Sequence, residues 1–470
     1  MLPRAPAPFR AANIISMPRY SFGASPILLG MANSPRYNVA DLAHPTATHN
    51  YRIPALINHR GRVLAFFDER PHPRAGSGWL GAGGAMADDL PNPNRILFCE
   101  LELAAPGQAE AEPVTASFPP AADANLSAQA NKNVRTYNGR WTLAQPVPGA
   151  PAVCSDACVA SDGHNLTLAY GSSTEIGYFG SQYAGPRLEP YIAYGPSVTQ
   201  LQHMPATELY TELRCDGLFA TSGSTVCMGT TALLPYVVRT GTEAHIRIVH
   251  VQEGKIRAIS DPITADNSAG IYLDETTLAW DGEYVHANFR AQGRGGRWVA
   301  YSRDGLSWSQ PRPLDLSDPG CNAKILLAPA PNSGSCAPLL LIHPHTTGFP
   351  ETGSAHPEPA ASTAGDPQPS GSLLPAAAPP EPAGLAVASP EPAGPAVAPP
   401  ETNSELLGAR ENGALVDYEG RVHYRFAPGE FGYADAVYLP GTTDLLVAYE
   451  RAQSIRCEVV PSLEGLINGI

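Results

Sequence analysis

Ser302-Arg-Asp304-Gly305-Leu-Ser-Trp308 has the residue order of a tight turn between two β-strands. An aspartate can accept hydrogen bonds from the amides that follow it, and a glycine supplies the positive φ that such a turn needs. Trp308 then stands where its ring can pack beneath the two strands. We therefore predict a β-hairpin at this point of the chain, with a structural and not a catalytic role for Asp304.

The same alternation of short apolar runs and turn residues continues on both sides of this turn. Each run ends at Gly, Asp, Asn or Pro after a few residues. The strands expected on this pattern include 52–57, 62–67, 95–101, 166–170, 245–251, 277–280, 285–289, 298–302, 339–343, 434–439 and 445–449. Many short strands at near-regular spacing predict an all-β sandwich, barrel or propeller.

Composition and charge support this fold class and argue against some partners. Of the 470 residues only 16% are charged, whereas glycines number 44 and prolines 49, a balance that favours short strands and turns. The formal net charge of −14 makes nucleic acid and anionic membranes unexpected as general partners. Lys132, Lys255 and Lys324 are the only lysines among the 30 basic residues, so an anion site here would be built of arginine.

The sequence predicts no membrane span, no cofactor and no metal centre. No stretch approaches the ~20 apolar residues of a span. Residues 26–30 are weakly apolar but fall short of the core of a secretory signal, which leaves extracellular and cytoplasmic locations both open. The eight cysteines include no CxxC pair and no accompanying histidine cluster, so a zinc site is not expected. Cys154 and Cys158 are near enough to pair, with buried free thiols as the alternative.

We expect one folded domain that carries an unfolded segment. Residues 1–40 are predicted to be a poorly ordered N-terminal extension, and 41–470 to be the folded domain. Within it, residues 350–405 are rich in Pro, Ala, Ser and Glu and contain two related decapeptides, 381–390 and 391–400. Such a stretch buries too little apolar surface to offset its ordering entropy, which predicts a disordered insertion.

Tyr51-Arg52-Ile53-Pro54 places an arginine at the apolar start of an expected strand. An unpaired buried guanidinium is costly, so Arg52 requires an anion there. A tetrapeptide match of this kind also arises by chance. A functional interpretation of this tetrapeptide depends on further motifs that follow at matching intervals along the chain.

Together with the turn at 302–308, which resembles the Asp box of the sialidase propellers, these elements make the chain similar to the exo-sialidases (neuraminidases). The motif pattern is nearest to that of the secreted actinobacterial enzymes, over roughly residues 48–457 without the insertion. The resemblance implies an all-β, six-bladed β-propeller with a disordered Pro/Ala-rich insertion. It also implies sialylated glycans or glycoproteins as partners, no metal or cofactor, and a monomer.

The resemblance further implies a clamp of three arginines for the substrate carboxylate. They are Arg52, Arg290 after the Asn-Phe pair, and Arg410 in Ala-Arg-Glu-Asn-Gly. Glu450, which follows the strand expected at 445–449, would orient Arg52. Arg70, in Asp-Glu-Arg-Pro, would line the pocket. For Arg70 a surface ion pair is the alternative, and for Arg290 it is an ordinary strand-end arginine.

Three further residues are the catalytic candidates that the resemblance implies. Tyr433 would be the nucleophile, although Ala434 replaces the serine that the family has after it. Glu275 would be its base, with an ordinary turn glutamate as the alternative. Asp89, in Asp-Leu-Pro-Asn-Pro-Asn, would be the general acid/base, with Asp88 as its rival. A glycine-rich stretch before Asp89 departs from the family and puts the position of this loop in doubt.

This set of residues makes chemical sense at the axis of a propeller, where the inner strands of all blades face one another. Three arginines there would repel one another unless an anion such as a carboxylate lay between them. A neutral tyrosine avoids the charge repulsion that a carboxylate nucleophile would meet, and sialidases are a known exception to the two-carboxylate scheme. The expected activity is that of a retaining exo-α-sialidase. The alternatives are a trans-sialidase, an intramolecular sialidase that forms an anhydro product, and a non-catalytic sialic acid-binding propeller.

Overall fold

The structure is a computed structural model that describes residues 36–72, 89–103, 136–265, 270–292, 296–316, 318–329, 338–345, 410–426 and 428–461. The predicted disordered insertion at 350–405 lies outside these residues, as do Asp88 and residues 1–35 of the predicted extension. The rest of that extension includes a strand, β1 (Arg36–Val39).

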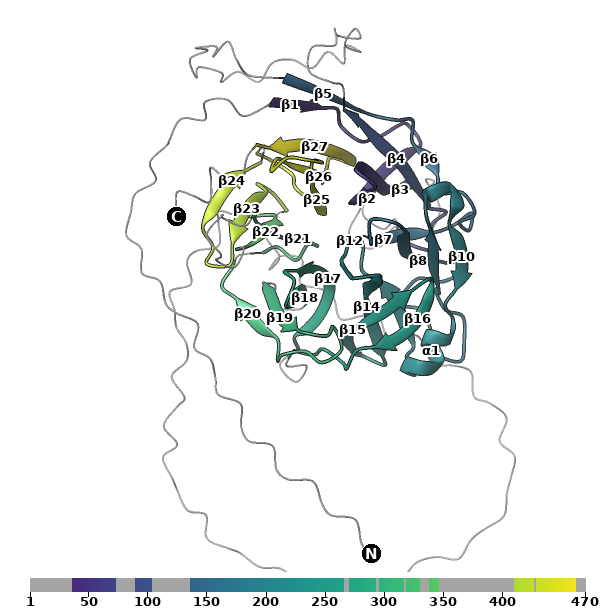
Figure 1. The fold of residues 1–470 in the computed structure, drawn as a ribbon. Helices are drawn as coiled ribbons and strands as arrows, with labels where there is room; N and C mark the ends of the chain where they lie inside the picture. Colours follow the sequence, from purple (N-terminus) through teal and green to yellow (C-terminus); the bar gives the residue numbers. More distant parts are fainter. Residues whose placement is uncertain are drawn as a thin grey trace, which may run out of the picture.

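The described strands form six β-sheets, which are arranged in a ring around a central axis (Figure 1). The structure is therefore all-β, and the predicted six-bladed propeller is confirmed. Within each blade the strands are mostly antiparallel and successive in sequence, which is the pattern that short hairpin connections produce. Strands β2, β17, β21 and β25 lie near the axis of the ring (Figure 1).

Blades 1 to 3 come from residues 36–259. Blade 1 contains β1, β2 (His49–His59), β3 (Arg62–Pro71), β4 (Arg95–Leu103), β5 (Thr136–Trp141) and β6 (Gln145–Pro146). Blade 2 contains β7 (Ser155–Ser161), β8 (Leu166–Ser172), β9 (Glu189–Gly195), β10 (Gln202–Pro205) and β12 (Gly223–Ser224). Blade 3 contains β11 (Gly217–Ala220), β13 (Cys227–Met228), β14 (Thr231–Thr240), β15 (Glu243–Gln252) and β16 (Lys255–Ile259).

Blades 4 to 6 complete the ring. Blade 4 contains β17 (Tyr272–Trp280), β18 (Val285–Gln292), β19 (Arg297–Ser302) and β20 (Arg312–Leu314). Blade 5 contains β21 (Lys324–Leu327), β22 (Leu339–His343), β23 (Ala414–Asp417) and β24 (Val422–Arg425), and blade 6 contains β25 (Ala434–Tyr438), β26 (Leu445–Arg451) and β27 (Ser454–Val460). Two short helices, η1 (Val198–Gln200) and α1 (Glu208–Leu213), flank β10. No helix among the described residues is long and apolar enough to cross a membrane.

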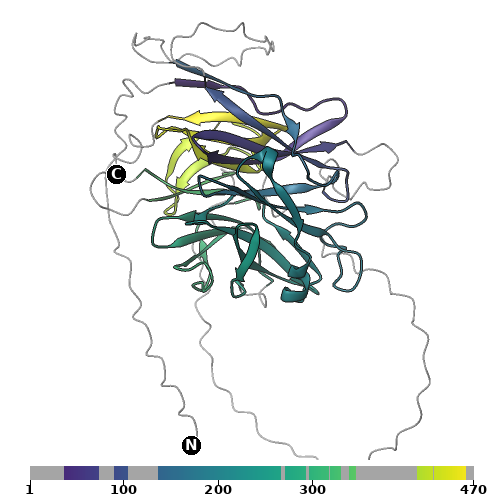
Figure 2. The ribbon, with the colours of Figure 1, turned by 45° about the vertical axis from the view of Figure 1, so that its right-hand side comes forward.

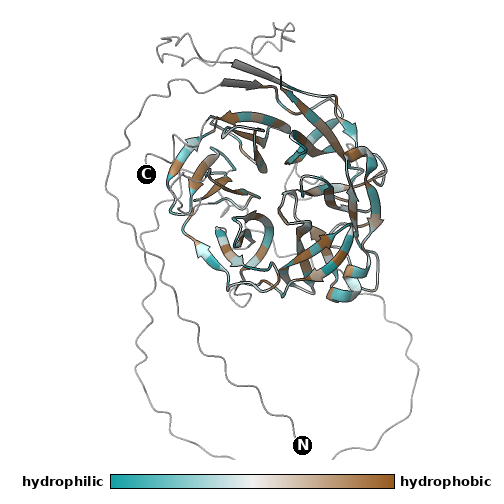
Figure 3. Ribbon diagram, in the orientation of Figure 1, coloured by the Kyte–Doolittle hydropathy of each residue, from teal (hydrophilic) through white to brown (hydrophobic). Residues whose placement is uncertain are grey.

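The apolar side chains are buried between neighbouring blades. Hydrophobic and hydrophilic residues alternate along many strands, so each sheet has apolar side chains for its neighbour (Figure 3). Between blades 1 and 6, for example, Leu56 and Phe67 pack with Leu446 and Ile455, and all four are fully buried. Burying one such side chain contributes about 1.5–3 kcal/mol, so these blade interfaces are the main source of stability.

The ring is closed by residues from the N-terminal side of the fold. Ala43 forms an antiparallel bridge with Ile455 of β27, beside blade 6. Asp41 accepts hydrogen bonds from the Arg456 side chain at 2.5 Å and from the Cys457 amide at 3.2 Å. The first and last strands, purple and yellow, accordingly lie side by side in both views (Figures 1 and 2).

A buried aspartate ties four strands together near the axis. Asp435 of β25 accepts hydrogen bonds from the amides of Leu56 on β2 and Ser224 on β12, at 2.8 and 2.7 Å. Its Oδ1 lies 3.1 Å from Nζ of Lys324 on β21. Because each polar atom finds a partner, the charged pair is accommodated in the interior. These contacts fix how the four inner strands meet.

The sequence left open whether Cys154 and Cys158 form a disulfide or are free thiols. In the structure both are buried free cysteines. Burial raises the pKa of both thiols to about 12, which leaves them protonated and unreactive at neutral pH.

Candidate active site

Three inner strands carry a β-bulge at the same end of the propeller. The register shifts between Arg52 and Ala55 in β2, between Ser155 and Cys158 in β7, and between Leu273 and Thr276 in β17. A bulge adds an unpaired residue and turns its side chain away from the ladder direction. The bulged segments carry Arg52, Asp156 and Glu275. The bulges therefore orient these side chains toward the site.

Backbone strain accompanies two of these bulges. Ile53 has a φ of +59° and Asp156 a φ of +64°. Positive φ is unfavourable for a β-branched residue such as isoleucine, and strained residues of this kind cluster at functional sites. The Ile53 amide donates to Glu450 Oε1 at 2.8 Å, which helps to hold the strained backbone in place.

Arg52 and Glu450 form a partly buried ion pair. The Arg52 Nε donates to Glu450 Oε1 at 3.2 Å, and the two side chains are 14% and 10% exposed. The guanidinium carbon lies 5.3 Å from the centre of the Tyr433 ring. Burial disfavours the charge on Arg52, but Glu450, Tyr433 and Asp89 together outweigh it and raise the pKa of Arg52. Arg52 therefore stays charged, with part of its guanidinium facing the tyrosine.

Tyr433, Glu275 and Arg290 form a chain of contacts across blades 4 and 6. The Tyr433 hydroxyl donates to Glu275 Oε1, and Arg290 Nη1 donates to Glu275 Oε2 at 2.9 Å. Burial, and then the charge of Glu275, raise the pKa of Tyr433 well above its ordinary value. The tyrosine is therefore neutral and hydrogen-bonded to an acceptor that is placed to take its proton.

Arg410 also lies against the ring of Tyr433. Its guanidinium carbon lies 5.7 Å from the centre of the Tyr433 ring, and Nη2 donates to the Gly320 carbonyl at 3.1 Å. Among the described residues Arg410 has no carboxylate partner, unlike Arg52 and Arg290. Its charge is therefore the one most available to an external anion.

Arg70 is surrounded by three carboxylates on the other side of the site. It donates to Asp68 Oδ2 at 2.7 Å, to Asp89 Oδ1 at 2.6 Å and to Asp156 Oδ1 at 3.3 Å. The Arg70 side chain is fully buried, so the alternative of a surface ion pair does not hold for this residue. Asp89 also lies 4.0 Å from Nη1 of Arg52, which links this group to the first arginine.

The pKa values of two carboxylates beside Arg70 are shifted in opposite directions. Desolvation raises the pKa of Asp89, whereas Arg70 and then Arg52 lower it. The side chain of Asp89 is 75% exposed, and the guanidiniums together hold its pKa below the ordinary value. For Asp156, desolvation prevails over Arg70 and raises the pKa to about 7. Asp156 is thus a second carboxylate that can carry a proton at neutral pH.

The structure brings together all eight residues that the sequence proposed for the site, at one end of the propeller. They are Arg52, Arg70, Asp89, Glu275, Arg290, Arg410, Tyr433 and Glu450, each joined to another member or to Tyr433 by a contact given above. The sequence interpretation missed Asp68 and Asp156. Asp68 lay in the recognised Asp-Glu-Arg-Pro segment, but the position of Asp156 in an ordinary strand gave no signal.

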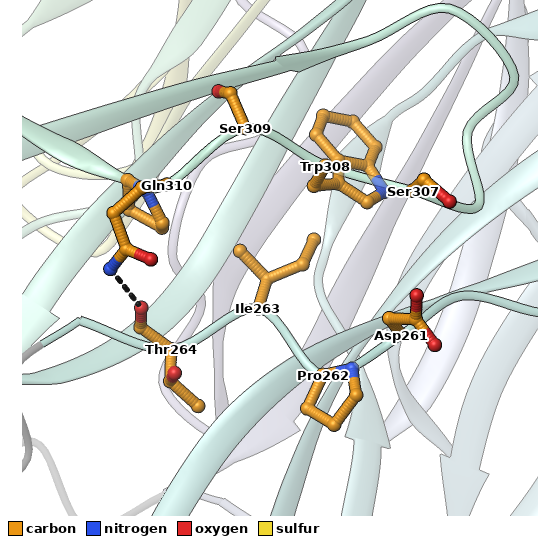
Figure 4. Close-up of a pocket in the computed structure, with 9 residues that line it drawn as sticks. Asp261, Pro262, Ile263, Thr264, Ser307, Trp308, Ser309 and Gln310 are labelled. Carbon is orange, nitrogen blue, oxygen red and sulfur yellow. Dashed lines mark hydrogen bonds between the residues drawn. The ribbon is translucent and has the colours of Figure 1, made fainter. Parts of the chain in front are cut away.

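The turn at 302–308 lies away from this site. Ser302 pairs with Val285 and Arg297 with Arg290, so the turn is at the opposite end of the β18–β19 pair from Arg290. Asp304 Oδ1 accepts hydrogen bonds from the amides of Leu306 and Ser307 at 2.8 and 2.9 Å. A small pocket beside Trp308 is lined by 261–264 and 307–311, and it contains none of the site residues (Figure 4).

The described residues contain no group of three or more His, Cys, Asp or Glu side chains arranged to hold a metal ion. The groups present in the site are instead arginines, carboxylates and a tyrosine. They can bind an anion, transfer protons and supply an oxygen nucleophile.

No family model and no curated protein sequence matches the chain. Among solved structures it is similar to the Hadza microbial sialidase Hz136, with a TM-score of 0.53 and 14% identity over 88% of this chain and 66% of that one. A mutant of Trypanosoma rangeli sialidase displaying trans-sialidase activity gives a TM-score of 0.50 and 12% identity, over 93% and 59%. The NanB sialidase from Streptococcus pneumoniae gives 0.50 and 11%, over 90% and 70%.

These similarities establish the fold, which is the propeller of the sialidases. The chain spans 66% and 59% of the length of the first two proteins, so each of them contains substantial sequence beyond the shared part.

Proposed function

We propose that the chain is a retaining exo-α-sialidase that releases terminal sialic acid from glycoconjugates. The observation that carries the proposal is the Tyr433–Glu275 hydrogen bond, set among arginines on a propeller of the sialidase fold. A binding protein would need the arginines, but it would not need a tyrosine joined to a buried base. The similarity to actinobacterial members rests on the sequence motifs alone.

In the proposed mechanism the substrate carboxylate lies against Arg52, Arg290 and Arg410. Arg52 and Arg290 are held by Glu450 and Glu275, so their positions are set before substrate binds. Arg410, without a carboxylate among the described residues, gains the most from the new anion. Preorganised donors of this kind lose little entropy on binding, and each charged hydrogen bond contributes about 1.5–3 kcal/mol.

The Tyr433 oxygen then attacks the anomeric carbon while its proton passes to Glu275. The glycosidic carbon–oxygen bond breaks, and the leaving oxygen takes a proton from Asp89. In the second step water attacks the anomeric carbon and gives a proton to Asp89, the bond between that carbon and the tyrosine oxygen breaks, and the released tyrosine oxygen takes the proton back from Glu275. Two displacements give net retention.

Asp89 has to be protonated for the first step. In the free site Arg70 and Arg52 hold its pKa below the ordinary value. A bound substrate carboxylate takes up part of the Arg52 charge, and the substrate removes water from the exposed Asp89 side chain. Both changes raise the pKa of Asp89, so substrate binding favours the protonated acid.

Product analysis with α2,3- and α2,6-sialyllactose tests the function. We expect release of free sialic acid, first seen as the α-anomer by NMR. Transfer to added lactose without net release would indicate a trans-sialidase, and an anhydro sugar would indicate the intramolecular reaction. Binding of sialyllactose with no product of any kind would contradict the enzymatic proposal and leave a binding propeller.

Changing Arg410 to lysine tests the clamp. Lysine keeps the charge but cannot make the planar, bidentate contact of a guanidinium. We expect KM for sialyllactose to rise about 10-fold or more with a smaller change in kcat, because binding of the carboxylate is weakened in both ground and transition states. Steady-state kinetics measure this, with Arg421→Lys, an exposed arginine of the same blade, as the control. An unchanged KM would remove Arg410 from the clamp.

A further inference from the structure

The link from blade 4 to blade 5 contains a turn whose conformation depends on one carboxylate. Pro319 and Gly320 occupy the middle of this turn, and Gly320 has a φ of +78°. Asp318 Oδ1 accepts the amide of Gly320 at 2.7 Å and that of Cys321 at 3.3 Å. The Asp-Pro-Gly-Cys order suits a turn that needs a fixed φ followed by a positive φ. Asp318 therefore sets the direction of the Gly320 and Cys321 peptide groups.

A buried arginine, Arg297, donates a hydrogen bond to a backbone carbonyl of the same turn. Arg297 Nη1 donates to the Cys321 carbonyl at 2.6 Å and lies 3.8 Å from Asp318 Oδ2, and both charged side chains are fully buried. Arg297 is itself fixed by Asn288 Oδ1, which accepts from Nε at 2.7 Å. A buried ion pair contributes little net stability compared with apolar packing. Here the Asp318–Arg297 pair fixes the turn, because Asp318 accepts from its amides and Arg297 donates to its Cys321 carbonyl.

The other face of the turn touches the candidate active site. The Gly320 carbonyl accepts the 3.1 Å hydrogen bond from Arg410 Nη2. The Cys321 side chain forms a small buried cluster with Ile53 and Tyr433. Among the described residues the Gly320 carbonyl is the one hydrogen-bond acceptor of the Arg410 guanidinium, and it therefore directs that guanidinium toward Tyr433.

We propose that Asp318, paired with Arg297, is a positioning residue for Arg410. It does not touch substrate; it fixes the turn whose Gly320 carbonyl orients the third arginine of the clamp. The inference rests on the proposed function, because it assumes that Arg410 binds the substrate carboxylate.

The test is Asp318→Asn in the full chain. Asparagine keeps the size and one acceptor oxygen, but it removes the charge that faces Arg297. We expect KM for α2,3-sialyllactose to rise about 10-fold, with kcat changed about twofold at most, as for a loss of one charged contact to bound substrate. Asp417→Asn is the matched control, since Asp417 is 3% exposed, lies in blade 5 and caps its own turn through the amides of Glu419 and Arg421. We expect no change of KM in the control.

A double-mutant cycle separates positioning from a general loss of stability. If Asp318 acts through Arg410, the Asp318→Asn change raises KM about 10-fold in the natural chain but has little further effect in an Arg410→Lys background. Equal effects in both backgrounds would overturn the proposal. If Asp318→Asn does not fold, Arg297→Lys provides the second variant, because lysine keeps the charge and loses the directed contacts to Cys321 and Asn288.

Amide hydrogen exchange measured by mass spectrometry gives a readout that does not depend on turnover. We expect faster exchange in Asp318→Asn both at 318–323 and at 410–413, and in Asp417→Asn only at 417–421. Unchanged exchange at 410–413 would overturn the positioning role. Absence of turnover in the natural chain, with the expected exchange pattern, would instead count against the proposed function and leave the structural link between Asp318 and Arg410 intact.

Discussion

Replacing Tyr433 with phenylalanine is expected to lower kcat/KM for a sialoside about 10³-fold or more. The change removes the hydroxyl that donates to Glu275 and leaves the ring in contact with Arg52 and Arg410. The carboxylate clamp therefore remains, and binding of free sialic acid is expected to stay within about threefold of the natural chain. Loss of a nucleophile typically costs several orders of magnitude in rate, whereas binding groups contribute to KM.

Tyr438→Phe provides the matched control for this experiment. Tyr438 lies on the same strand, β25, and its hydroxyl donates to the Leu327 carbonyl at 2.7 Å. The control thus loses one partly buried tyrosine hydrogen bond without altering the candidate site, and its kcat/KM is expected to be unchanged. Retention of full turnover by Tyr433→Phe would refute the tyrosine mechanism. Loss of sialic acid binding in that variant, which keeps the ring, would show that the hydroxyl also contributes to binding.

Replacing Asp89 with asparagine is expected to slow hydrolysis of sialyllactose by about 10²–10⁴-fold, the usual contribution of a general acid. Asparagine cannot supply a proton to the leaving oxygen. An aryl sialoside has a leaving group that needs little protonation, so its first step is expected to slow much less. The ratio of kcat/KM for the aryl sialoside to that for sialyllactose therefore measures the role of Asp89 directly.

Asp156→Asn is the comparison that this experiment requires. Asp156 shares Arg70 with Asp89, and burial raises its pKa to about 7, which makes it a competing proton donor. We expect Asp156→Asn to slow both substrates by a similar factor. If the strong dependence on the leaving group is found in Asp156→Asn and not in Asp89→Asn, then Asp156 is the acid and the assignment of Asp89 is wrong.

Much of the fold could be predicted from the sequence because its signals are local. A strand of alternating polarity and the turn that ends it involve only a few neighbouring residues. The predicted strands around 62–67, 166–170 and 285–289 correspond to β3, β8 and β18. The number of blades was not readable from periodicity and came from the resemblance of the motifs.

The roles within the site were harder to predict, because they depend on contacts between distant residues. Asp156 occupies a strand of ordinary sequence, and only the bulge with its positive φ turns the side chain toward Arg70. Asp318 is separated from Arg410 by 92 positions, and nothing in its local sequence indicates that the turn faces an arginine. Neither residue could be found by a rule that considers spacing alone.

By itself, the sequence determined the chemical types that meet in the site, because motifs such as Tyr51-Arg52-Ile53-Pro54 and the segment around Tyr433 specify residue identity and order. The tertiary structure alone decided the pairings beyond the predicted contacts of Glu450 with Arg52 and of Glu275 with Tyr433. It paired Glu275 with Arg290 as well, it surrounded Arg70 with three carboxylates, and it left Arg410 without a carboxylate among the described residues. The physical reason is that charge and acidity depend on distance and burial across blades, which a linear sequence does not contain.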